Sequence, residues 1–310
     1  MAKILAICTS EKKGTVKLPV ESAVLIEQHG IENDAHAGSW HRQVSLLSAD
    51  KIAEFRQKGV NVAYGAFGEN IVAALDFRAM PVGTLLRAGD AILEITQIGK
   101  ACHTACEIRR ITGDCIMPRE GVFARVLKGG VIRTGDEIEM IAREGKRPYT
   151  AAVITLSDKG SRGEREDVSG PVIKTRLEEN GYVVEERLLL PDGEQPLKGE
   201  LMRLCDQRQI DLILTTGGTG FTPRDCTPEA TKAVAEREVP GIAEYLRAYS
   251  MQITKRAMFS RGVSVIRGKS LIVNLPGSPK AVNECLDAVL DTLPHGLDML
   301  RNSAGDCARS

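Results

Sequence analysis

The chain has 310 residues, which is long for a single domain and predicts two. Its 43% hydrophobic and 26% charged residues are ordinary for a globular protein, so either half can bury a core. The 41 Lys and Arg residues are balanced by 41 Asp and Glu residues, which excludes a general nucleic-acid binder and means that an anionic ligand needs a local site.

The cysteines and the N-terminal segment indicate the cellular compartment. The eight cysteines are irregularly spaced, which favours reduced thiols over a disulfide framework. The first residues lack the apolar core and cleavage site of a signal peptide, and no stretch reaches the roughly 20 apolar residues that span a bilayer. We therefore expect a cytoplasmic protein that has no membrane segment.

Residues 1–142 contain short apolar runs separated by glycine-centred turns. Strand-like runs occur at 22–26, 43–47, 84–86, 91–98, 122–127 and 137–141. The sequences Ala88-Gly-Asp90 and Thr134-Gly-Asp136 each precede such a run, as hairpin turns do. One helix is expected at 49–58, with Ser48 as its N-cap. Many strands and few helices predict a mainly-β barrel or sandwich.

A linker separates this part from the rest of the chain. Residues 143–148 are charged, contain Gly and Pro and lack apolar periodicity. Beyond them, strands are expected at 150–156, 182–190, 211–215, 263–266 and 270–274, and helices at 171–179, 195–205, 228–237, 242–253 and 279–300. This alternation predicts that residues 149–310 form a three-layer α/β domain, a mostly parallel sheet with helices on both faces.

A glycine-rich loop follows the apolar strand in Asp211-Leu-Ile-Leu-Thr-Thr-Gly-Gly-Thr-Gly220. Ligands of parallel sheets bind beyond the carboxyl ends of the strands, where glycines let backbone N–H groups approach phosphate oxygens. Thr215, Thr216 and Thr219 add hydroxyl donors, and the absence of a following Gly-Lys-Ser/Thr excludes a Walker loop. We expect a phosphate site here.

Three acidic residues lie in loops at the same predicted edge. Thr227 with Pro228 behind it predicts a helix start, so Asp225 is not needed as a cap, and we favour a metal or nucleotide role over a turn role. The local sequence favours Asp192 as an N-cap that forms a capping box with Gln195. Asp158 could close an Asx turn.

Four motifs occur in order along this half of the chain. They are Ser157-Asp-Lys-Gly160, Leu-Pro-Asp192, the T-T-G-G-T-G-x-x-x-R-D-x-T-P-E-A-T segment and Asn274-Leu-Pro-Gly-Ser-Pro279. From about Thr150 to Leu300 the chain therefore closely resembles the molybdopterin adenylyltransferases. The resemblance implies a three-layer α/β fold, a homotrimer and the transfer of AMP from Mg-ATP to the terminal phosphate of molybdopterin. Such catalysis needs positioning and charge neutralisation and no nucleophilic side chain.

The resemblance also implies residue roles. Asp192 and Asp225 match the acidic pair that is essential for adenylylation, and we expect them to be the Mg²⁺ ligands. Further ligand-binding positions are Ser157, Asp158, Thr216, Gly217, Gly218, Thr219, Gly220, Asn274, Pro276, Gly277 and Ser278. Ser260 and Arg261 match a Ser-Arg pair that is associated with the pterin site, and Asp167 matches an acidic position in the first loop.

The cysteines near residue 100 allow three interpretations. Cys102, His103, Cys106 and Cys115 could bind zinc, although Cys-x-x-x-Cys without a second close pair is poor zinc spacing. They could be small buried residues. One of them could instead be a reactive thiolate activated by nearby basic side chains, of which Lys100, Arg109, Arg110 and Arg119 are the candidates.

The N-terminal motifs also carry a resemblance. G-I-E-N-D-A-H-A-G, G-A-F-G-E-N-I, G-K-A-C-H-T-A-C and E-G-V-F-A-R-V-L-K-G-G resemble a MOSC domain over residues 1–142. That family ties one cysteine to sulfur carriage or molybdenum binding, and its position indicates Cys102, with Cys106 and Cys115 as alternatives. His36 and Arg42 are expected to line the ligand pocket.

Three functions remain open. The first is an adenylyltransferase joined to a cofactor-handling MOSC partner, which would keep a labile intermediate at high effective concentration. The second is a non-catalytic carrier of molybdopterin or the molybdenum cofactor, and the third makes the MOSC domain a redox or sulfur-transfer enzyme. The presence of Asp192 and Asp225 favours the first. Molybdopterin, ATP and molybdenum-insertion or cofactor-recipient proteins are the implied partners.

Overall fold

The computed structural model describes residues 2–101, 109–110 and 113–301. The chain divides into two compact units, Met1–Arg147 and Pro148–Ser310. None of the helices in the described ranges has both the length and the apolar content that crossing a bilayer would need.

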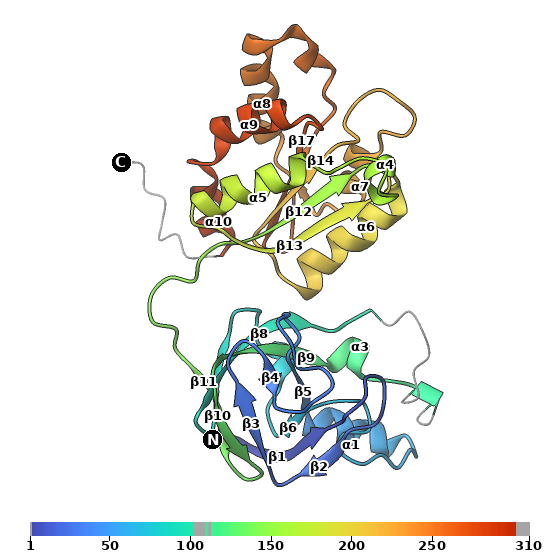
Figure 1. Cartoon of the computed structure of the whole chain (residues 1–310), viewed down its shortest axis with the longest axis vertical. Coiled ribbons are helices and arrows are strands. Elements are labelled where there is room, and N and C mark those ends of the chain that lie inside the picture. The colour runs from blue at the N-terminus through green and yellow to red at the C-terminus, as the bar shows by residue number, and fades with distance from the viewer. Residues whose placement is uncertain (1, 102–108, 111–112, 302–310) are drawn as a thin grey trace. The chain divides into compact units, whose positions relative to one another are not determined.

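The N-terminal unit is a closed β-barrel (Figure 1). Seven strands pair in the order β11–β7–β8–β9–β5–β6–β1, and β11 pairs back onto β1. Their bounds are β1 Ala2–Thr9, β5 Val44–Ser48, β6 Ile71–Ala73, β7 Leu85–Ala88, β8 Ala91–Ile98, β9 Val122–Lys128 and β11 Glu137–Ile141. Inward-facing residues such as Ile4, Leu46 and Leu93 are fully buried and form its core. The expected mainly-β fold is confirmed as a barrel.

Smaller elements flank the barrel. β2 (Leu18–Val20) pairs with β1, and β10 (Gly130–Arg133), β3 (Ser22–Ile26) and β4 (Gly30–Ile31) form a second sheet. Helical elements in the described part of this unit include α1 (Ala49–Gln57), η1 (Phe77–Ala79) and α3 (Met117–Glu120). Ser48 is the N-cap residue of α1, as predicted, but its side chain makes no capping hydrogen bond.

Of the two predicted hairpins, one is correct. The turn at Gly89 joins β7 to β8, which pair with each other. The turn at Gly135 joins β10 to β11, which belong to different sheets, because β10 pairs with β3 and β11 pairs with β7 and β1. Its sequence specified a chain reversal but not the strands that pair.

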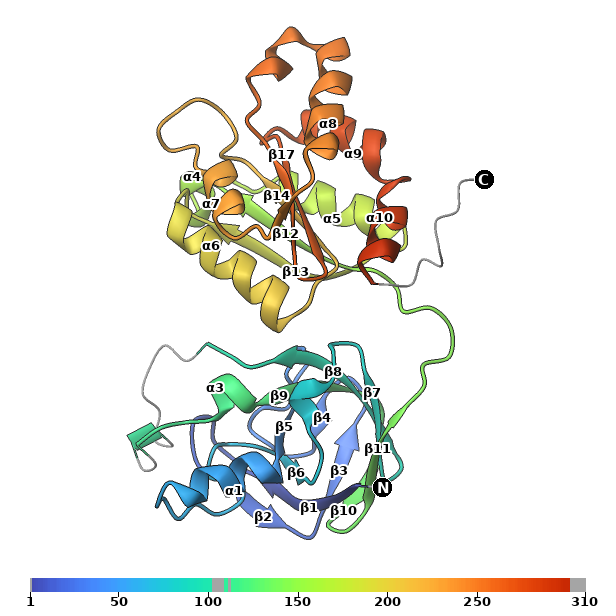
Figure 2. The same cartoon turned by 180° about the vertical axis from the view of Figure 1, so that it is seen from behind.

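The C-terminal unit is a six-stranded sheet between two layers of helices, as Figure 2 shows. The strand order is β13–β12–β14–β17–β16–β15. The first four strands are parallel to one another, β16 is antiparallel to β17, and β15 is antiparallel to β16. The strands are β12 Thr150–Leu156, β13 Val183–Leu190, β14 Leu212–Thr216, β15 Arg237–Glu238, β16 Ser264–Arg267 and β17 Ser270–Leu275. The predicted three-layer α/β fold is confirmed.

Each face of this sheet has its own apolar core. One core contains residues of α5 (Ser169–Glu179), α8 (Pro240–Ile253), α9 (Pro279–Val289) and α10 (Leu293–Leu300). The other contains residues of α6 (Glu194–Met202), η2 (Arg203–Gln207) and α7 (Thr227–Ala233). Short α4 (Asp158–Ser161) follows β12, and η3 (Lys255–Phe259) follows α8. Because the carboxyl ends of parallel strands share an edge, the loops after β12, β13, β14 and β17 lie together.

Two predicted helices differ from the structure. The single helix expected at 279–300 is two helices, α9 and α10, and Pro294 lies in the first turn of α10. Proline lacks an N–H donor, and its ring would clash with the carbonyl of Leu290 in a continuous helix. The helix expected to reach residue 237 ends at Ala233, because Arg237 and Glu238 form the edge strand β15.

Candidate functional site

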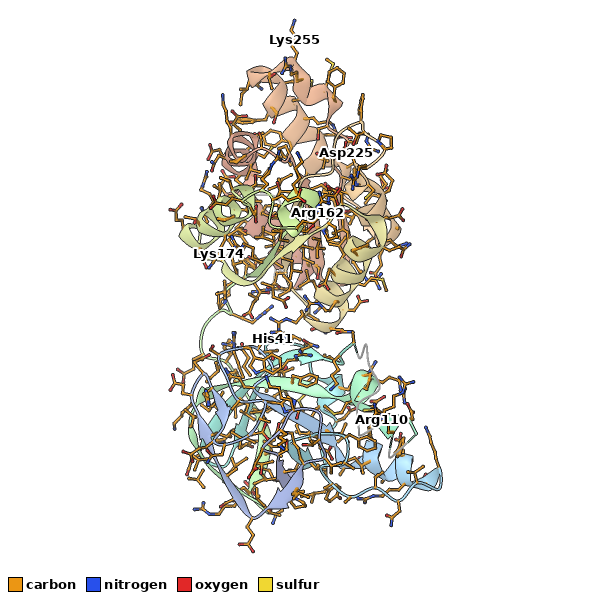
Figure 3. The ribbon with its side chains drawn as sticks, turned by 45° about the vertical axis from the view of Figure 1, so that its right-hand side comes forward. His41, Arg110, Arg162, Lys174, Asp225 and Lys255 are labelled. Atoms are coloured by element: carbon orange, nitrogen blue, oxygen red, sulfur yellow. The ribbon has the colours of Figure 1, made fainter. Side chains whose placement is uncertain are left out.

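A cleft of about 560 Å³ opens at the carboxyl edge of the parallel strands. Asp192, which follows β13, and Asp225, which follows β14, both line it (Asp225 is labelled in Figure 3). Other lining residues include Ser157, Thr216, Gly217, Gly218, Gly277 and Ser278. The sheet topology therefore brings together loops that are far apart in the sequence.

The glycine loop packs so closely against the end of β12 and the start of α7 that side chains cannot fit. Gly217 and Gly218 have φ angles of 96° and 63°, which L residues with side chains rarely adopt. A Cβ atom on Gly217 would lie 2.5 Å from the carbonyl oxygen of Leu156, and one on Gly218 would lie 2.4 Å from Oγ1 of Thr227. This conformation requires glycine and brings bare backbone to the wall of the cleft.

Buried hydroxyl groups hold this loop in place. Thr216 Oγ1 donates to the carbonyl oxygen of Pro276 at 2.7 Å, and Thr227 Oγ1 donates to that of Gly217 at 2.9 Å. Thr227 is the first residue of α7, not its cap, so the predicted cap is wrong. The residue instead links the helix to the glycine loop.

Asp192 is fixed by a partner from another loop. Its Oδ2 accepts the N–H of Asp158 at 3.0 Å, and Oδ1 of Asp158 accepts the N–H of Asp192 at 3.1 Å. α6 begins at Glu194, and no side chain caps it, so the predicted capping box is wrong. Burial, and then the negative charge of Asp225, raise the pKa of Asp192. The charge of Asp225 is thus felt at Asp192 in the cleft.

Asp225 does have a role in a turn. Its Oδ2 accepts the N–H of Thr222 at 2.8 Å and the hydroxyl of Thr222 at 2.7 Å. Both bonds use the same carboxylate oxygen. The turn and a ligand in the cleft are therefore compatible roles for this side chain.

The charged residues among the described lining of the cleft are mainly acidic. Glu166, Asp167, Asp192 and Asp225 face a single lining cation, Arg165. A polyphosphate would be repelled by this set unless a divalent cation came with it. Among the residues that the structure describes, no group of three or more His, Cys, Asp or Glu could hold a metal ion. Mg²⁺, however, commonly binds through one or two carboxylates together with substrate phosphates and water, so the pair fits Mg²⁺.

Asp167 and the residues near it were only partly predicted. Asp167 accepts the N–H of Gly170 at 2.9 Å and the hydroxyl of Thr155 at 3.1 Å, which fixes the start of α5. Ser169 Oγ donates to the carbonyl oxygen of Gly277 at 2.8 Å. Arg165 and Glu166 carried no sequence signal beyond their place in the loop after β12.

A second pocket, of about 220 Å³, lies beside α8 and α9. Ser260, Asn274 and Pro276 line it together with Arg247 and Arg256. The loop after β17 thus contributes to both cavities, because Pro276 lines this pocket and Gly277 lines the cleft.

Asn274 and Arg261 use their polar groups within the protein. Nδ2 of Asn274, a residue that is 4% exposed, donates to Thr215 and Thr231, and its Oδ1 accepts the N–H of Val263. The guanidinium of Arg261 donates to the carbonyl oxygens of Gly220 and Asp225 and pairs with Glu229. Arg261 is absent from the described linings of both cavities and instead holds the glycine loop.

The remaining predicted loop residues have structural contacts. Ser157 Oγ accepts the N–H of Gly160 and caps α4, and Ser278 Oγ accepts the N–H of Ala281 and caps α9. The carbonyl oxygen of Thr219 accepts the N–H of Arg261. Ser157 and Ser278 also line the cleft.

In the barrel unit, the predicted Cys102, His103 and Cys106 lie outside the described residues, and Cys115 is buried. Nδ1 of His36 lies 3.3 Å from Nζ of Lys17, which forms a buried ion pair with Asp34. The guanidinium of Arg42 stacks over the ring of Trp40 at 4.7 Å. His41 and Arg110 of this unit are labelled in Figure 3.

Two family models match the chain. The model described as "Probable molybdopterin binding domain" matches residues 152–295, and the model described as "MOSC domain" matches residues 33–139. The chain thus combines a MOSC domain with a molybdopterin-binding type of domain.

Known proteins match the C-terminal part. The molybdopterin adenylyltransferase of Helicobacter pylori (strain J99) is 41% identical over 152 residues, which cover 48% of this chain and 85% of that protein. The molybdenum cofactor synthesis protein cinnamon of Drosophila melanogaster is 40% identical over 154 residues, 49% of this chain and 25% of that protein. The crystal structure of the molybdopterin biosynthesis enzyme MoaB from Thermus thermophilus is 45% identical and covers 50% of this chain and 97% of that one, with a TM-score of 0.48.

Proposed function

The chain belongs to the molybdopterin adenylyltransferase family, and on this premise we propose that its C-terminal unit transfers AMP from Mg-ATP to the terminal phosphate of molybdopterin. The observation that carries the proposal is that Asp192 and Asp225, in the loops after two different strands, line one cleft with Gly217 and Gly218. This arrangement places the acidic pair beside backbone that can approach phosphate oxygens.

The reaction joins two anions. An oxygen of the molybdopterin phosphate attacks the α-phosphorus of ATP, the bond from that phosphorus to the bridging oxygen breaks, and the electron pair leaves with pyrophosphate. Mg²⁺ held by Asp192 and Asp225 would supply positive charge to the phosphate oxygens. Gly217 and Gly218 would hold those oxygens through backbone N–H groups, and the hydroxyl of Thr216 keeps the loop after β17 against them.

The second pocket is the proposed site of the pterin. Ser260 and Pro276 line it, Asn274 fixes its wall, and the loop that ends at Ser278 also reaches the cleft. A pterin in this pocket could therefore present its phosphate to the nucleotide. Asp158 is proposed to act by holding Asp192, and Arg261 by holding Gly220 and Asp225.

The finer assignments are also proposals. We infer that residues 1–142 handle sulfur or the molybdenum cofactor through Cys102, and that the chain works as a cytoplasmic homotrimer that passes its product to molybdenum-insertion or cofactor-recipient proteins. The family resemblance of both parts supports these assignments.

The test uses the full chain with molybdopterin and Mg-ATP, and measures pyrophosphate and the AMP adduct. Asp225→Asn should lower the rate at least about a hundredfold, because the carboxylate that holds the metal is lost. The matched control is Asp287→Asn, which neutralises an exposed carboxylate of α9 that pairs with Arg176 of α5. A carrier would bind molybdopterin without releasing pyrophosphate, and an unchanged rate in Asp225→Asn would remove the metal role.

A further inference from the structure

Arg224 joins two loops that each contribute other residues to the lining of the cleft. It lies in the loop after β14, and its guanidinium forms an ion pair with the carboxylate of Asp158 in the loop after β12. The Arg224 side chain is 68% exposed, whereas that of Asp158 is 14% exposed. The guanidinium is therefore an accessible cation that contacts Asp158, whose N–H donates to Asp192 of the cleft.

The pair joins Arg224 to the network around Asp192. Oδ1 of Asp158 accepts the N–H of Asp192, and Oδ2 pairs with Arg224. An ion pair with so exposed a partner contributes little to stability, so it can be exchanged for a better one. Phosphate oxygens are such partners, because guanidinium binds them in a planar, bidentate geometry.

The other arginines near the cleft are placed differently. The guanidinium of Arg261 donates hydrogen bonds to the carbonyl oxygens of Gly220 and Asp225 and to the carboxylate of Glu229. Arg165 is the one cation among the described lining residues. A nucleoside triphosphate needs more positive charge than Arg165 provides, and Arg224 can supply it by releasing Asp158.

The order of strands indicates which phosphates Arg224 reaches. β14, which carries the glycine loop, lies between β12 and β17. The proposed pterin pocket is lined from the β17 side by Asn274 and Pro276, whereas Arg224 extends to Asp158 on the β12 side. The part of ATP that points away from the pterin is its β- and γ-phosphates.

We propose that Arg224 exchanges Asp158 for the β- and γ-phosphates of ATP and holds them as they leave as pyrophosphate. The inference rests on the proposed adenylyl transfer. When the bond from the α-phosphorus to the bridging oxygen breaks, the electron pair remains on pyrophosphate, and Arg224 neutralises this charge without giving up a proton.

Calorimetric binding to the full chain, without molybdopterin, tests the proposal. Arg224→Gln should weaken Mg-ATP and Mg-pyrophosphate binding at least about tenfold, the loss expected for a charge-assisted hydrogen bond, and leave AMP binding unchanged. Asp158→Asn keeps an amide oxygen for the N–H of Asp192 but frees Arg224, so it should bind Mg-ATP at least as tightly as the unmodified chain. Arg162→Gln is the matched control, because Arg162 is also an exposed arginine in an ion pair, with Glu164 (Arg162 is labelled in Figure 3).

The outcomes separate the two proposals. Equal ATP binding by Arg224→Gln and the unmodified chain would overturn the role of Arg224 while leaving adenylyl transfer intact. Equal losses for ATP and AMP would also overturn it, since they would show a general disturbance of the loop. Failure of the unmodified chain to bind Mg-ATP would overturn both.

Discussion

Replacement of Asn274 by alanine should destabilise the C-terminal unit rather than act on ligand contacts. The amide donates to Thr215 and Thr231, both at 2.9 Å, and accepts the N–H of Val263 at 3.2 Å. At about 1 kcal/mol for each hydrogen bond, Asn274→Ala should lower the free energy of unfolding by about 3 kcal/mol. For a unit of this size, that corresponds to a fall of about 6–12 °C in the melting temperature.

The sequence provides an internal control for this measurement. The single tryptophan, Trp40, lies in a loop of the N-terminal unit, so its fluorescence follows the unfolding of that unit. Most helices lie in the other unit, so circular dichroism at the helix band follows the C-terminal unit. Asn274→Ala should lower the second midpoint and leave the first unchanged. Asn180→Ala, which removes an exposed amide that donates to the carbonyl oxygen of Arg176, should change neither by more than about 0.5 kcal/mol.

One result would refute this reasoning. If Asn274→Ala unfolds at the same temperature as the unmodified chain but binds molybdopterin more weakly, the amide contacts the ligand and its internal hydrogen bonds are not essential. The role implied by family resemblance would then be the right one for this side chain.

Two further perturbations test the barrel and the glycine loop. Burial raises the pKa of Glu69 from 4.5 to about 7, so its contribution to barrel stability is full below pH 4.5 and is lost as the pH rises through 7. The melting temperature followed by Trp40 fluorescence should therefore fall from pH 5 to pH 8, and should fall less in Glu69→Gln. Equal falls in the two proteins would contradict this role of Glu69. Gly217→Ala would place a Cβ atom 2.5 Å from the carbonyl oxygen of Leu156 and should abolish Mg-ATP binding in calorimetry. The control is Gly163→Ala, at a φ of 75° with no atom close to the added Cβ. It should strain the backbone by about 1–2 kcal/mol and leave Mg-ATP binding intact.

Much of the fold could be predicted because periodicity and glycine placement are local signals. The alternation of strands and helices beyond residue 150 was enough to predict a parallel sheet with two helical layers. The break before α10 was missed, although the sequence signals it, since Pro294 cannot continue a helix through Leu290. The pairing of β10 with β3 could not be predicted from the sequence, because a turn sequence sets the chain reversal whereas the barrel core sets which strands pair.

The roles of the site residues, too, could be predicted only in part from the local sequence. Local sequence favoured Asp192 as a helix cap, but its carboxylate accepts a hydrogen bond from Asp158, which lies 34 positions earlier. Likewise Thr227 looked like a cap and instead holds the carbonyl oxygen of Gly217. Such tertiary partners leave no trace in a window of a few residues. Only the family resemblance pointed to Asp192, and only the structure brings it into the same cleft as Asp225.

The polar residues of these motifs therefore fall into two groups that different experiments separate. Thr216, Thr227 and Asn274 are almost fully buried, and their hydrogen bonds shape the cavities, so replacing them would impair an enzyme and a carrier alike. Asp192 and Asp225 line the cleft, and the fold uses only part of their capacity to accept hydrogen bonds. If the unit is a carrier, neutralising these two acids should leave molybdopterin binding intact or strengthen it, because it removes negative charge from beside a phosphate. If the unit is an enzyme, the same change must abolish pyrophosphate release while binding persists, and this pair is therefore where the two functions diverge.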